Sequence, residues 1–403
     1  MIPVEEAEAR IRRALHPTPA AWVHVDAAHD RVLAEDLAAL RDQPAADVSA
    51  MDGYAVRAAE AIDGAVLALE GEAAAGGAGG GALAPGTARR IFTGGLVPEG
   101  ADTILIQENA ERAGERVRVR VAAEADRHIR RRGQDFTTGT TMLGAGRRLT
   151  ARDLGLAVAL GHGAVPVRRR PRIGVAGTGN ELVRPGVPPR PEQVPNSNVT
   201  ALMAAVRAFG GEALDLGIVR DTPDALAALA GRARGLDLLV TTGGASVGDH
   251  DLVKSALGTA GLELDFWKIA MRPGKPLLFG RLGDVPVLGL PGNPVSALVC
   301  TLLFVRAALD RLLDAAPAPL PLVDAELAAP LAANGERRDF MRARLERADE
   351  DGRLAAHPAE RQDSAMLATL AHADGLVVRP ANDPTKPAGS LVKVLRFSDL
   401  PRF

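Results

Sequence analysis

The chain is poor in the residues that build several common kinds of site. Of its 403 residues only one is cysteine, and 3% are aromatic. A single cysteine, Cys300, excludes a disulfide within the chain and a zinc site made of several cysteines. It lies in an apolar run and is interpreted as a small buried side chain. Scarce aromatic side chains argue against stacking platforms for single-stranded nucleic acid.

Strong net charge and long apolar runs are also lacking. The formal net charge of −2 gives no global field that would hold nucleic acid or an acidic membrane surface. No uninterrupted apolar run is long enough to span a bilayer, and residues 1–15 indicate a charged amphipathic helix rather than a signal peptide. We therefore expect a soluble, cytoplasmic protein that binds neither nucleic acid nor membrane.

The length of the chain and its changing patterns predict several domains. Residues 1–41 and 137–168 are expected to form a helical elongated domain, interrupted at 42–136 by an inserted, mostly β domain with short β runs between glycines and prolines. Strands and helices alternate over residues 169–316, which predicts a doubly wound α/β domain with a parallel sheet. Residues 317–403 return to short β runs and predict a C-terminal β barrel.

Three glycine-rich turns lie in the predicted α/β domain: TTGGASVGDHD, RPGKP and LPGNP. Glycine permits a close backbone approach to a ligand, and the helix start expected after the first and last turns attracts anions. The first turn is neither a Walker loop nor a dinucleotide fingerprint, because the Gly-Lys-Ser/Thr ending and the glycine spacing are missing. Lys275, between two prolines, is explained equally well as a phosphate ligand or as a solvated side chain.

Carboxylates follow the ends of several predicted strands. Glu181 follows the first strand, Asp221 the second, and Asp249 and Asp251 the third. Because ligands of such sheets bind at the carboxyl ends of the strands, these side chains can converge on one cleft. Several carboxylates facing an anion-binding loop suggest Mg²⁺ bridging to phosphate oxygens. Helix capping alone would explain Asp221 or Asp249.

The predicted insert carries three further motifs. SAMDGYAV holds Tyr54, the only tyrosine of the chain, so we interpret it as more than a surface hairpin. IFTGGLVPEGADT is a turn cluster with Thr93 near its apex. HIRRRGQD gathers three arginines, and a solvated basic turn explains it as well as an anion-contacting loop.

With these motifs in this order, the chain resembles the MoeA-type molybdopterin molybdenumtransferases, bacterial relatives of the gephyrin E domain. The matching segments are collinear from about residue 42 to residue 345, and they are SAMDGYAV, IFTGGLVPEGADTILIQE, IRRRGQD, GVAGTGNEL, TTGGASVGDHD, FWKIAMRPGKPLLFG, GLPGNPVSALV and RRDFMRARL. Chance similarity does not explain so many ordered motifs.

The resemblance implies both an assembly and a reaction. It implies a MogA-like α/β domain and a homodimer, with a cleft shared between the α/β domain of one subunit and the inserted domain of the other. It implies Mg²⁺-dependent cleavage of adenylylated molybdopterin, with molybdate as the second substrate and with molybdenum cofactor and AMP as products. It also implies the MogA-type adenylyltransferase as a partner.

The resemblance further assigns roles to single residues. The catalytic candidates are Asp52, Thr93, Glu181, Asp221, Asp251 and Lys275, of which Glu181, Asp221 and Asp251 are the metal candidates. The substrate-binding candidates are Gly243, Gly244, Ser246, Gly248, Asp249, Arg272, Pro273, Gly274, Pro291, Gly292, Asn293, Pro294, Ser296, Arg130, Arg131 and Arg132. Asp52 and Thr93 are expected to reach in from the partner subunit, and Gly243, Gly244, Ser246 and Lys275 to hold the pterin-side phosphate.

Some positions depart from the family pattern. Ala46 stands where an aromatic residue is expected, and Asn196 stands where the family commonly carries aspartate, which removes a charge near the cleft. The tail segment ERQDSAML keeps Gln362 and Ser364 but is otherwise weak. Two other functions stay open: a MogA-type adenylyltransferase, against which the insert argues, and a non-catalytic gephyrin-like scaffold, against which the retained carboxylates argue.

Overall fold

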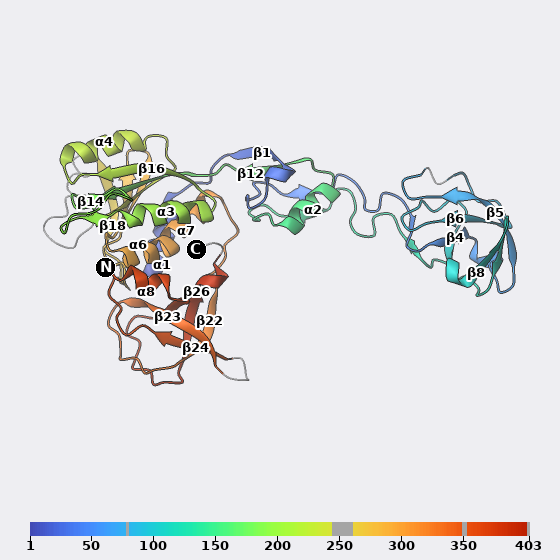
Figure 1. Ribbon diagram of the computed structural model, residues 1–403. Helices are drawn as coiled ribbons and strands as arrows, with labels where there is room; N and C mark the ends of the chain where they lie inside the picture. The colour runs from blue at the N-terminus through green and yellow to red at the C-terminus, as the bar shows by residue number, and fades with distance from the viewer. Residues whose placement is uncertain (78–79, 244–260, 349–352, 401–403) are drawn as a thin grey trace.

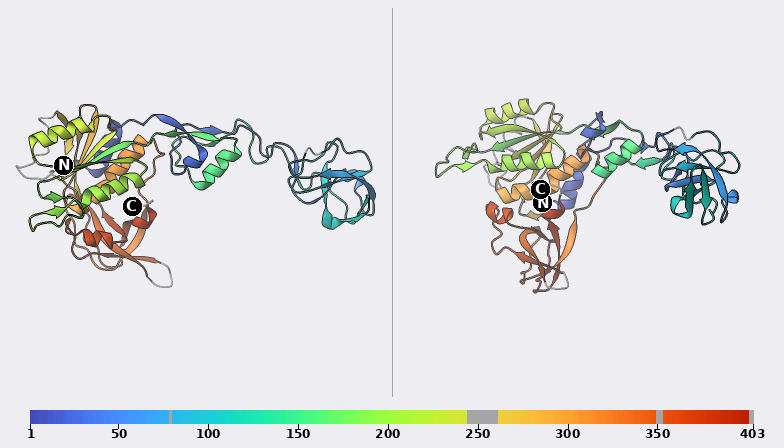
Figure 2. Two further views of the ribbon diagram at one scale, coloured as in Figure 1. Left: turned by 45° about the horizontal axis from the view of Figure 1, so that its top comes forward. Right: turned by 45° about the vertical axis from the view of Figure 1, so that its right-hand side comes forward.

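The computed structural model describes residues 1–77, 80–243, 261–348 and 353–400. The molecule is elongated: the α/β domain and the C-terminal barrel lie together at one end, and the inserted β domain lies at the other (Figures 1 and 2). The chain crosses a narrow middle part twice, on its way into the insert and back. Residues 251–260 of the helix predicted for 251–261 lie outside the described residues. Five site candidates also lie outside them, namely Gly244, Ser246, Gly248, Asp249 and Asp251.

The α/β domain is built on a six-stranded sheet with the order β16-β13-β17-β21-β20-β18. In chain order the strands are β13 (Arg172–Thr178), β16 (Glu212–Val219), β17 (Leu238–Thr242), β18 (Leu262–Trp267), β20 (Leu278–Leu282) and β21 (Val285–Leu290). The predicted parallel pairing is confirmed for β16, β13, β17 and β21. β20 is antiparallel to both of its neighbours, β21 and β18, and a tight turn through Gly283 joins it directly to β21 with no room for a crossover helix.

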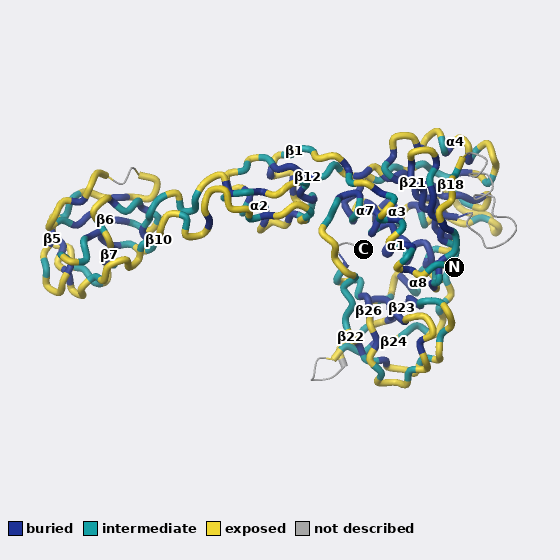
Figure 3. The backbone as a smooth tube through the Cα atoms, turned by 180° about the vertical axis from the view of Figure 1, so that it is seen from behind, coloured by how far each residue is buried: buried dark blue, intermediate teal, exposed yellow. Residues whose placement is uncertain are grey.

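Helices cover both faces of this sheet, as a doubly wound domain requires. One face packs against α1, α3, α6 and α7, and the other packs against α4. The bounds are α1 (Val4–Ala14), α3 (Ser197–Ala208), α4 (Pro223–Ala233), α6 (Pro294–Cys300) and α7 (Arg306–Leu312), with a π-helical turn (Thr301–Val305) joining the last two. Figure 3 shows that buried backbone is concentrated in this sheet and its helices, so the domain provides a rigid base for the loops at the strand ends.

Helix α1 packs differently from the predicted domain division. Residues 1–41 were expected to belong to the elongated domain, whereas Val4, Ala7 and Ile11 are buried in the core of the α/β domain. Their spacing of three and four residues places them on one helical face. An apolar stripe needs a core to cover it, and the core of the α/β domain covers this one.

The elongated part contains more β structure than predicted. β1 (Ala20–His24) pairs with β12 (Ala164–Arg168), and β2 (Leu37–Ala38) pairs with β11 (Thr141–Leu143). Its helix is α2 (Ala151–Ala159), which begins after Thr150. These elements share a small core that includes Leu33, Leu143, Ala157 and Val165. These strand pairs were not predicted from the sequence because each strand is short and partly exposed.

The insert forms a six-stranded sheet with the order β7-β4-β6-β5-β9-β8, which confirms a mostly β domain. Its strands are β4 (Gly53–Val56), β5 (Val66–Ala73), β6 (Thr87–Ile91), β7 (Thr103–Ile106), β8 (Ala110–Ala113) and β9 (Arg116–Val119). Tyr54 is 5% exposed and belongs to the core of this domain. The only tyrosine is therefore a packing residue on a central strand, and it leaves the preceding Asp52 at the strand start.

The C-terminal region closes into a five-stranded barrel, as predicted. The pairings run from β23 through β24, β22, β26 and β25 back to β23. The bounds are β22 (Leu322–Leu327), β23 (Arg338–Ala348), β24 (Arg353–Pro358), β25 (Gly375–Arg379) and β26 (Leu391–Arg396). A short strand of the α/β domain, β19 (Met271–Arg272), pairs with β23, and this pairing fixes the RPGKP loop against the barrel.

Candidate active site

The ends of the parallel strands β13, β17 and β21 meet at one edge of the sheet, as predicted from the strand-end rule. Gly243 follows β17 with a φ of +99°, and a Cβ on it would lie 2.1 Å from the carbonyl oxygen of Thr178. A Cβ on Gly292, which follows β21, would lie 3.4 Å from the Cα of Gly243. Glycine is therefore required at Gly243 because two strand ends approach closely there.

Asn198 joins these strand ends to helix α3. Its Nδ2 donates to Thr242 Oγ1 at 2.9 Å and to the carbonyl oxygen of Gly292 at 2.8 Å. Thr242 Oγ1 in turn donates to the carbonyl oxygen of Pro291 at 3.1 Å. The network holds the end of β17 and the LPGNP turn in a fixed relation. Asn198 was not predicted as a site residue, although the second asparagine of VPNSN lies two positions after Asn196.

Replacing Asn198 with alanine is expected to destabilise the α/β domain by about 1–3 kcal/mol, because two hydrogen bonds between separate elements are lost and their acceptors stay unpaired. Urea unfolding of the purified chain measures the effect. Asn109→Ala is the control, since its side chain has no hydrogen-bond partner within the described ranges of the insert. Equal stability of the two variants would contradict a bridging role for Asn198.

A cavity of about 670 Å³ lies between these loops and the C-terminal barrel. The α/β domain lines it with Glu181, Gly243, Arg272, Pro273, Gly274, Lys275, Pro276, Pro291, Gly292, Asn293 and Ser296. The barrel and the segment that follows β24 line it with Arg337, Gln362, Asp363 and Ser364. All of these α/β residues except Pro276 were predicted site residues. Ten predicted site residues are thus brought together in one cleft. Pro294 opens helix α6 at its rim.

The RPGKP loop is held in place from two sides. Arg272 Nη2 donates to the Asp339 carboxylate of β23 at 2.7 Å, where Asp339 is buried. Gly274 has a φ of +114°, and a Cβ there would lie 2.6 Å from the Sγ of Cys300. Cys300 is fully buried, as predicted, and burial raises the pKa of its thiol. It therefore packs beneath the loop as an apolar side chain, and the loop presents Lys275 to the cleft on a stiff backbone.

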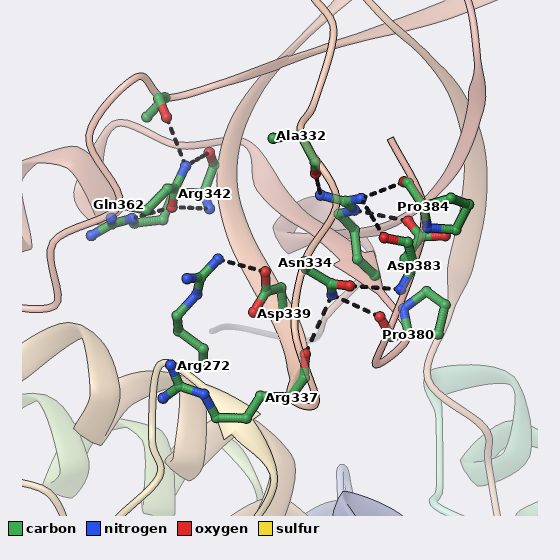
Figure 4. A network of polar contacts seen from close by, with 12 residues as sticks. Arg272, Ala332, Asn334, Arg337, Asp339, Arg342, Gln362, Pro380, Asp383 and Pro384 are labelled. Atoms are coloured by element: carbon green, nitrogen blue, oxygen red, sulfur yellow. Dashed lines mark hydrogen bonds and ion pairs between the residues drawn. The ribbon is translucent and has the colours of Figure 1, made fainter. Parts of the chain in front are cut away.

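The segment after β24 is anchored by Arg342, which is 1% exposed (Figure 4). Its guanidinium donates to Gln362 Oε1 at 3.1 Å and to the carbonyl oxygen of Asp363 at 2.6 Å. The next residue, Ser364, accepts a hydrogen bond at its Oγ from Asn293 Nδ2 at 2.7 Å. Asn293 directly precedes helix α6, and its side chain bridges to the barrel side of the cleft rather than capping the helix.

The contribution of the barrel to the cleft was largely missed from the sequence. Gln362 and Ser364 were noted as kept in an otherwise weak segment, but Arg337 and Asp363 were not singled out. The available signal was the four arginines of RRDFMRARL, one of which, Arg342, is too buried to be a surface charge. A buried arginine that satisfies several carbonyl groups marks a segment held in a fixed position.

Two of the three predicted metal ligands lie close together. Burial and the neighbouring charge of Glu181 raise the pKa of Asp221, while a hydrogen bond from its N–H to Asn180 at 3.3 Å orients the turn. The Asp221 Oδ1 atom is buried and has no hydrogen-bond partner in the described residues. An orphaned carboxylate oxygen beside a second carboxylate suits a hard divalent cation, so these residues fit Mg²⁺. Within the described ranges no group of three or more His, Cys, Asp or Glu side chains is arranged to hold a metal.

Replacing Asp221 with asparagine is expected to raise the melting temperature at neutral pH in the absence of metal. Because the carboxyl pKa is raised in the folded state, the penalty of ionised Asp221 is present above that pKa and disappears as the pH falls through it. The advantage of Asp221→Asn should therefore shrink towards acidic pH. Added Mg²⁺ should stabilise the wild type more than the variant. Scanning calorimetry across pH tests this, and identical melting curves would contradict it.

Asp52 and Thr93 form a contact within the insert. Asp52 Oδ1 accepts hydrogen bonds from the N–H and the Oγ1 of Thr93, both at 2.8 Å. These bonds, with the nearby charge of Arg90, lower the pKa of Asp52. The pair lies where β4 begins and β6 ends. This domain lies at the opposite end of the elongated molecule from the cleft (Figure 1). One chain therefore does not bring these two residues to Glu181 and Lys275.

The three arginines of the HIRRRGQD motif in the insert differ in their surroundings. Arg131 pairs with Asp47 at 2.6 Å and also contacts Asp126, and Arg132 pairs with Asp42 at 2.5 Å. Arg130 lines a cavity that also includes Gly94, next to Thr93. Two of the three charges are thus already balanced by carboxylates, and Arg130 is the arginine placed towards the Asp52–Thr93 contact.

Asn196 lies outside the cleft described above. It is 5% exposed, begins helix α3 and accepts a hydrogen bond at its Oδ1 from Val199 N–H at 3.4 Å. Its side chain packs over Gly177 of β13, where a Cβ would lie 2.7 Å from Nδ2. Asn196, which replaces a charge expected near the cleft, therefore lines a neighbouring cavity. The effect of the lost charge on metal affinity stays a prediction.

Comparison with known proteins agrees with this architecture. Three family models match the chain: the MoeA N-terminal region (domain I and II) over residues 2–161, the probable molybdopterin binding domain over residues 174–311, and the MoeA C-terminal region (domain IV) over residues 324–397. These matches cover the elongated part with its insert, the α/β domain and the barrel in turn. They define the chain as a multidomain protein of the molybdopterin-related class.

Whole-length relatives specify the family. Molybdopterin molybdenumtransferase 2 of Mycobacterium tuberculosis is 38% identical over 401 residues, covering 96% of each chain. The molybdopterin molybdenumtransferase of Bacillus subtilis is 31% identical, covering 98% of this chain and 94% of its own. The solved structure of the molybdopterin biosynthesis MoeA protein from Pyrococcus horikosii superposes with a TM-score of 0.86 at 31% identity, covering 98% of this chain and 99% of that one.

The chain belongs to the MoeA family of molybdopterin molybdenumtransferases. It is a transferase of molybdenum cofactor biosynthesis, and its substrate is related to molybdopterin. In the described part of the chain, every helix is too short or too polar to cross a membrane.

Proposed function

We propose that the chain inserts molybdenum from molybdate into adenylylated molybdopterin and releases AMP in a Mg²⁺-dependent reaction. The observation that carries the proposal is the meeting of unlike charges in one cleft. Arg272, Lys275 and Arg337 line the same cavity as Glu181, which lies beside Asp221. Cations suit the phosphates of an anionic substrate, and paired carboxylates suit the metal that such phosphates bring.

Each group has a chemical task in this proposal. Lys275, on its stiff loop, holds the pterin-side phosphate, and the backbone around Gly243 lets that phosphate approach closely. Glu181 and Asp221, with Asp251 from outside the described residues, would hold Mg²⁺, which would supply positive charge to neutralise the phosphates. Cleavage of the phosphoanhydride transfers the adenylyl phosphorus to an incoming oxygen, so that AMP leaves and the terminal phosphate stays on the pterin. Positioning and charge neutralisation are the main demands of such a reaction.

The proposal includes a homodimer whose cleft takes Asp52 and Thr93 from the partner subunit. Its support is the placement of that contact at the far end of the elongated chain (Figure 1). A C2 dimer uses the same surface twice and therefore creates two equivalent clefts. Arg130 would enter with the same domain and add a positive charge near the incoming molybdate. We also infer a cytoplasmic location and contact with the MogA-type adenylyltransferase, which cell fractionation and co-purification test.

Purified protein incubated with adenylylated molybdopterin, Mg²⁺ and molybdate tests the reaction. AMP release together with formation of molybdenum cofactor is the expected result, and chelation of Mg²⁺ should abolish both. Adenylation of molybdopterin from ATP would support a MogA-type adenylyltransferase instead. No turnover with either substrate would support a non-catalytic scaffold of the gephyrin type.

A further inference from the structure

The first residues of the chain lie against the base of the RPGKP loop. Figure 1 shows them where the α/β domain meets the barrel. Ile2 forms an isolated parallel bridge with Ile269, just ahead of the loop. The Ile2 N–H donates to the carbonyl oxygen of Lys268 at 3.3 Å, and the Ile2 carbonyl oxygen accepts from the Ala270 N–H at 2.8 Å. The reaction proposed above gives these contacts no task.

The segment that Ile2 contacts is bonded to the returning half of the same loop. The Ile269 N–H donates to the carbonyl oxygen of Lys275 at 3.0 Å, and the Lys268 N–H donates to that of Leu277 at 3.1 Å. These two bonds close the loop on itself. A shift of the segment bonded to Ile2 would therefore also displace Lys275, which lines the cleft.

The barrel strand β23 is joined both to this segment and to the start of helix α1. The Arg338 N–H donates to the carbonyl oxygen of Ala270 at 2.9 Å, just before the pairing of β19 with β23 begins. The Arg338 guanidinium also contacts the carboxylate of Glu5, which lies in the first turn of α1. Residues 2–5, called the N-terminal segment below, and β23 are therefore linked to each other as well as to the loop.

Helix α1 fixes the N-terminal segment in place. Val4 is 6% exposed, and Ile2 packs against the same hydrophobic core. Pro3 precedes the helix, its ring restricts φ, and its carbonyl oxygen accepts from the Ala7 N–H at 3.1 Å. The backbone groups that Ile2 offers to the loop thus have little freedom to move, which is what the support of a functional loop requires.

We propose that the N-terminal segment is a positioning element of the active site and acts through the RPGKP loop. By bonding to Lys268 and Ala270, Ile2 holds the loop base where Arg272 and Lys275 line the cleft. A displacement of about 1 Å in a group that positions substrate can cost about 10²-fold in rate. The assignment rests on the proposed function, since it takes the two cations as ligands of the substrate phosphates.

The KM and kcat of molybdenum insertion by Ile2→Pro test the assignment. Proline at this position lacks the N–H that bonds to Lys268 but keeps a carbonyl oxygen for Ala270. Phosphate ligands act on bound substrate and transition state alike. The KM for adenylylated molybdopterin is therefore expected to rise about tenfold, as when a hydrogen bond to a charged group is weakened, while kcat changes less than about twofold. Ile2→Val keeps the N–H and should restore the wild-type KM.

Two variants of helix α1 test the link to the barrel. Glu5→Gln breaks the ion pair with Arg338 and should raise the KM about two- to fivefold, a smaller effect because the pair is partly exposed. Glu8→Gln is the matched control, since Glu8 pairs with Arg12 at 2.9 Å within the same helix, and its KM should stay that of the wild type. An unchanged KM in Ile2→Pro overturns the proposal. A lowered kcat at unchanged KM also overturns it, because fewer folded molecules would give that result.

The fluorescence of Trp267 separates failure of this assignment from failure of the proposed function. Trp267 directly precedes Lys268, and the other tryptophan of the chain, Trp22, is exposed on β1 and can be replaced with phenylalanine. In that background Ile2→Pro should shift the Trp267 emission, and Ile2→Val should not. If the wild type releases AMP and Ile2→Pro keeps its KM, the positioning role fails and the proposed function stands. If the wild type releases no AMP, the proposed function fails and the emission decides: a shift supports the hold of Ile2 on the loop, and an unchanged emission overturns it.

Discussion

Replacement of Gly243 with alanine is expected to destabilise the α/β domain by about 2–5 kcal/mol and to abolish molybdenum insertion. A Cβ at this position would lie 2.1 Å from the carbonyl oxygen of Thr178, and the φ of +99° is one that L side chains avoid. The backbone term costs about 1–2 kcal/mol and the forced separation of two packed strand ends about 1–3 kcal/mol more. Urea unfolding, followed by the AMP-release assay at a temperature where the variant is folded, measures both effects.

Gly235→Ala is the matched control in the same domain. Gly235 also has a positive φ, +77°, but an added Cβ would meet nothing within 4 Å. This variant should show only the backbone cost and retain activity. If the two variants lose the same stability and the same activity, the close approach of β13 and β17 is not what requires glycine at Gly243.

Asp52→Asn is expected to lower molybdenum insertion by roughly 10²–10³-fold while the unfolding curve stays unchanged. The asparagine Oδ1 can still accept from Thr93 N–H, so the turn is preserved and only the negative charge is removed. The lowered pKa of Asp52 keeps this charge at neutral and mildly acidic pH. The contribution of Asp52 to wild-type activity should therefore be lost only when the pH falls through that lowered pKa.

Asp63→Asn provides the comparison for Asp52→Asn. Asp63 lies in the same insert and also accepts a backbone hydrogen bond, from Ala122 N–H at 2.6 Å. Its replacement removes a similar charge away from the predicted cleft and should leave insertion unaffected. Equal activity of the two variants would show that the charge of Asp52 takes no part in the reaction.

Local patterns predicted the parts of the fold that depend on neighbours in sequence. The glycine turns after β13, β17 and β21 lie where the alternation of strands and helices placed them, and the C-terminal β runs close into a barrel. Strands β18 and β20, the second of which runs against the rest of the sheet, were missed because they flank RPGKP, a segment interpreted only as a loop. The packing of α1 on the α/β core was missed because an amphipathic helix indicates that it needs a core without indicating which one.

For the candidate site, too, only the features that depend on neighbours in sequence could be predicted. Residues within glycine-rich motifs, such as Lys275 and Gly243, line the predicted cleft. The barrel wall with Arg337 and Asp363 depends on pairing between β19 and β23, a contact between distant segments that no local pattern reveals. Asn196 was expected to remove a charge near the cleft, and its side chain lines the cavity beside the cleft.

The central claim is that one cleft is built from two copies of the chain, with Glu181 from one and Asp52 from the other. Asp52→Asn and Glu181→Gln chains carrying different affinity tags can be co-expressed, and the mixed dimer can be purified through both tags. Such a dimer has one intact cleft and one cleft with both changes, so its molybdenum-insertion rate should be about half that of the wild type. Each parent variant alone should be nearly inactive. A mixed dimer no more active than its parents would contradict the shared cleft.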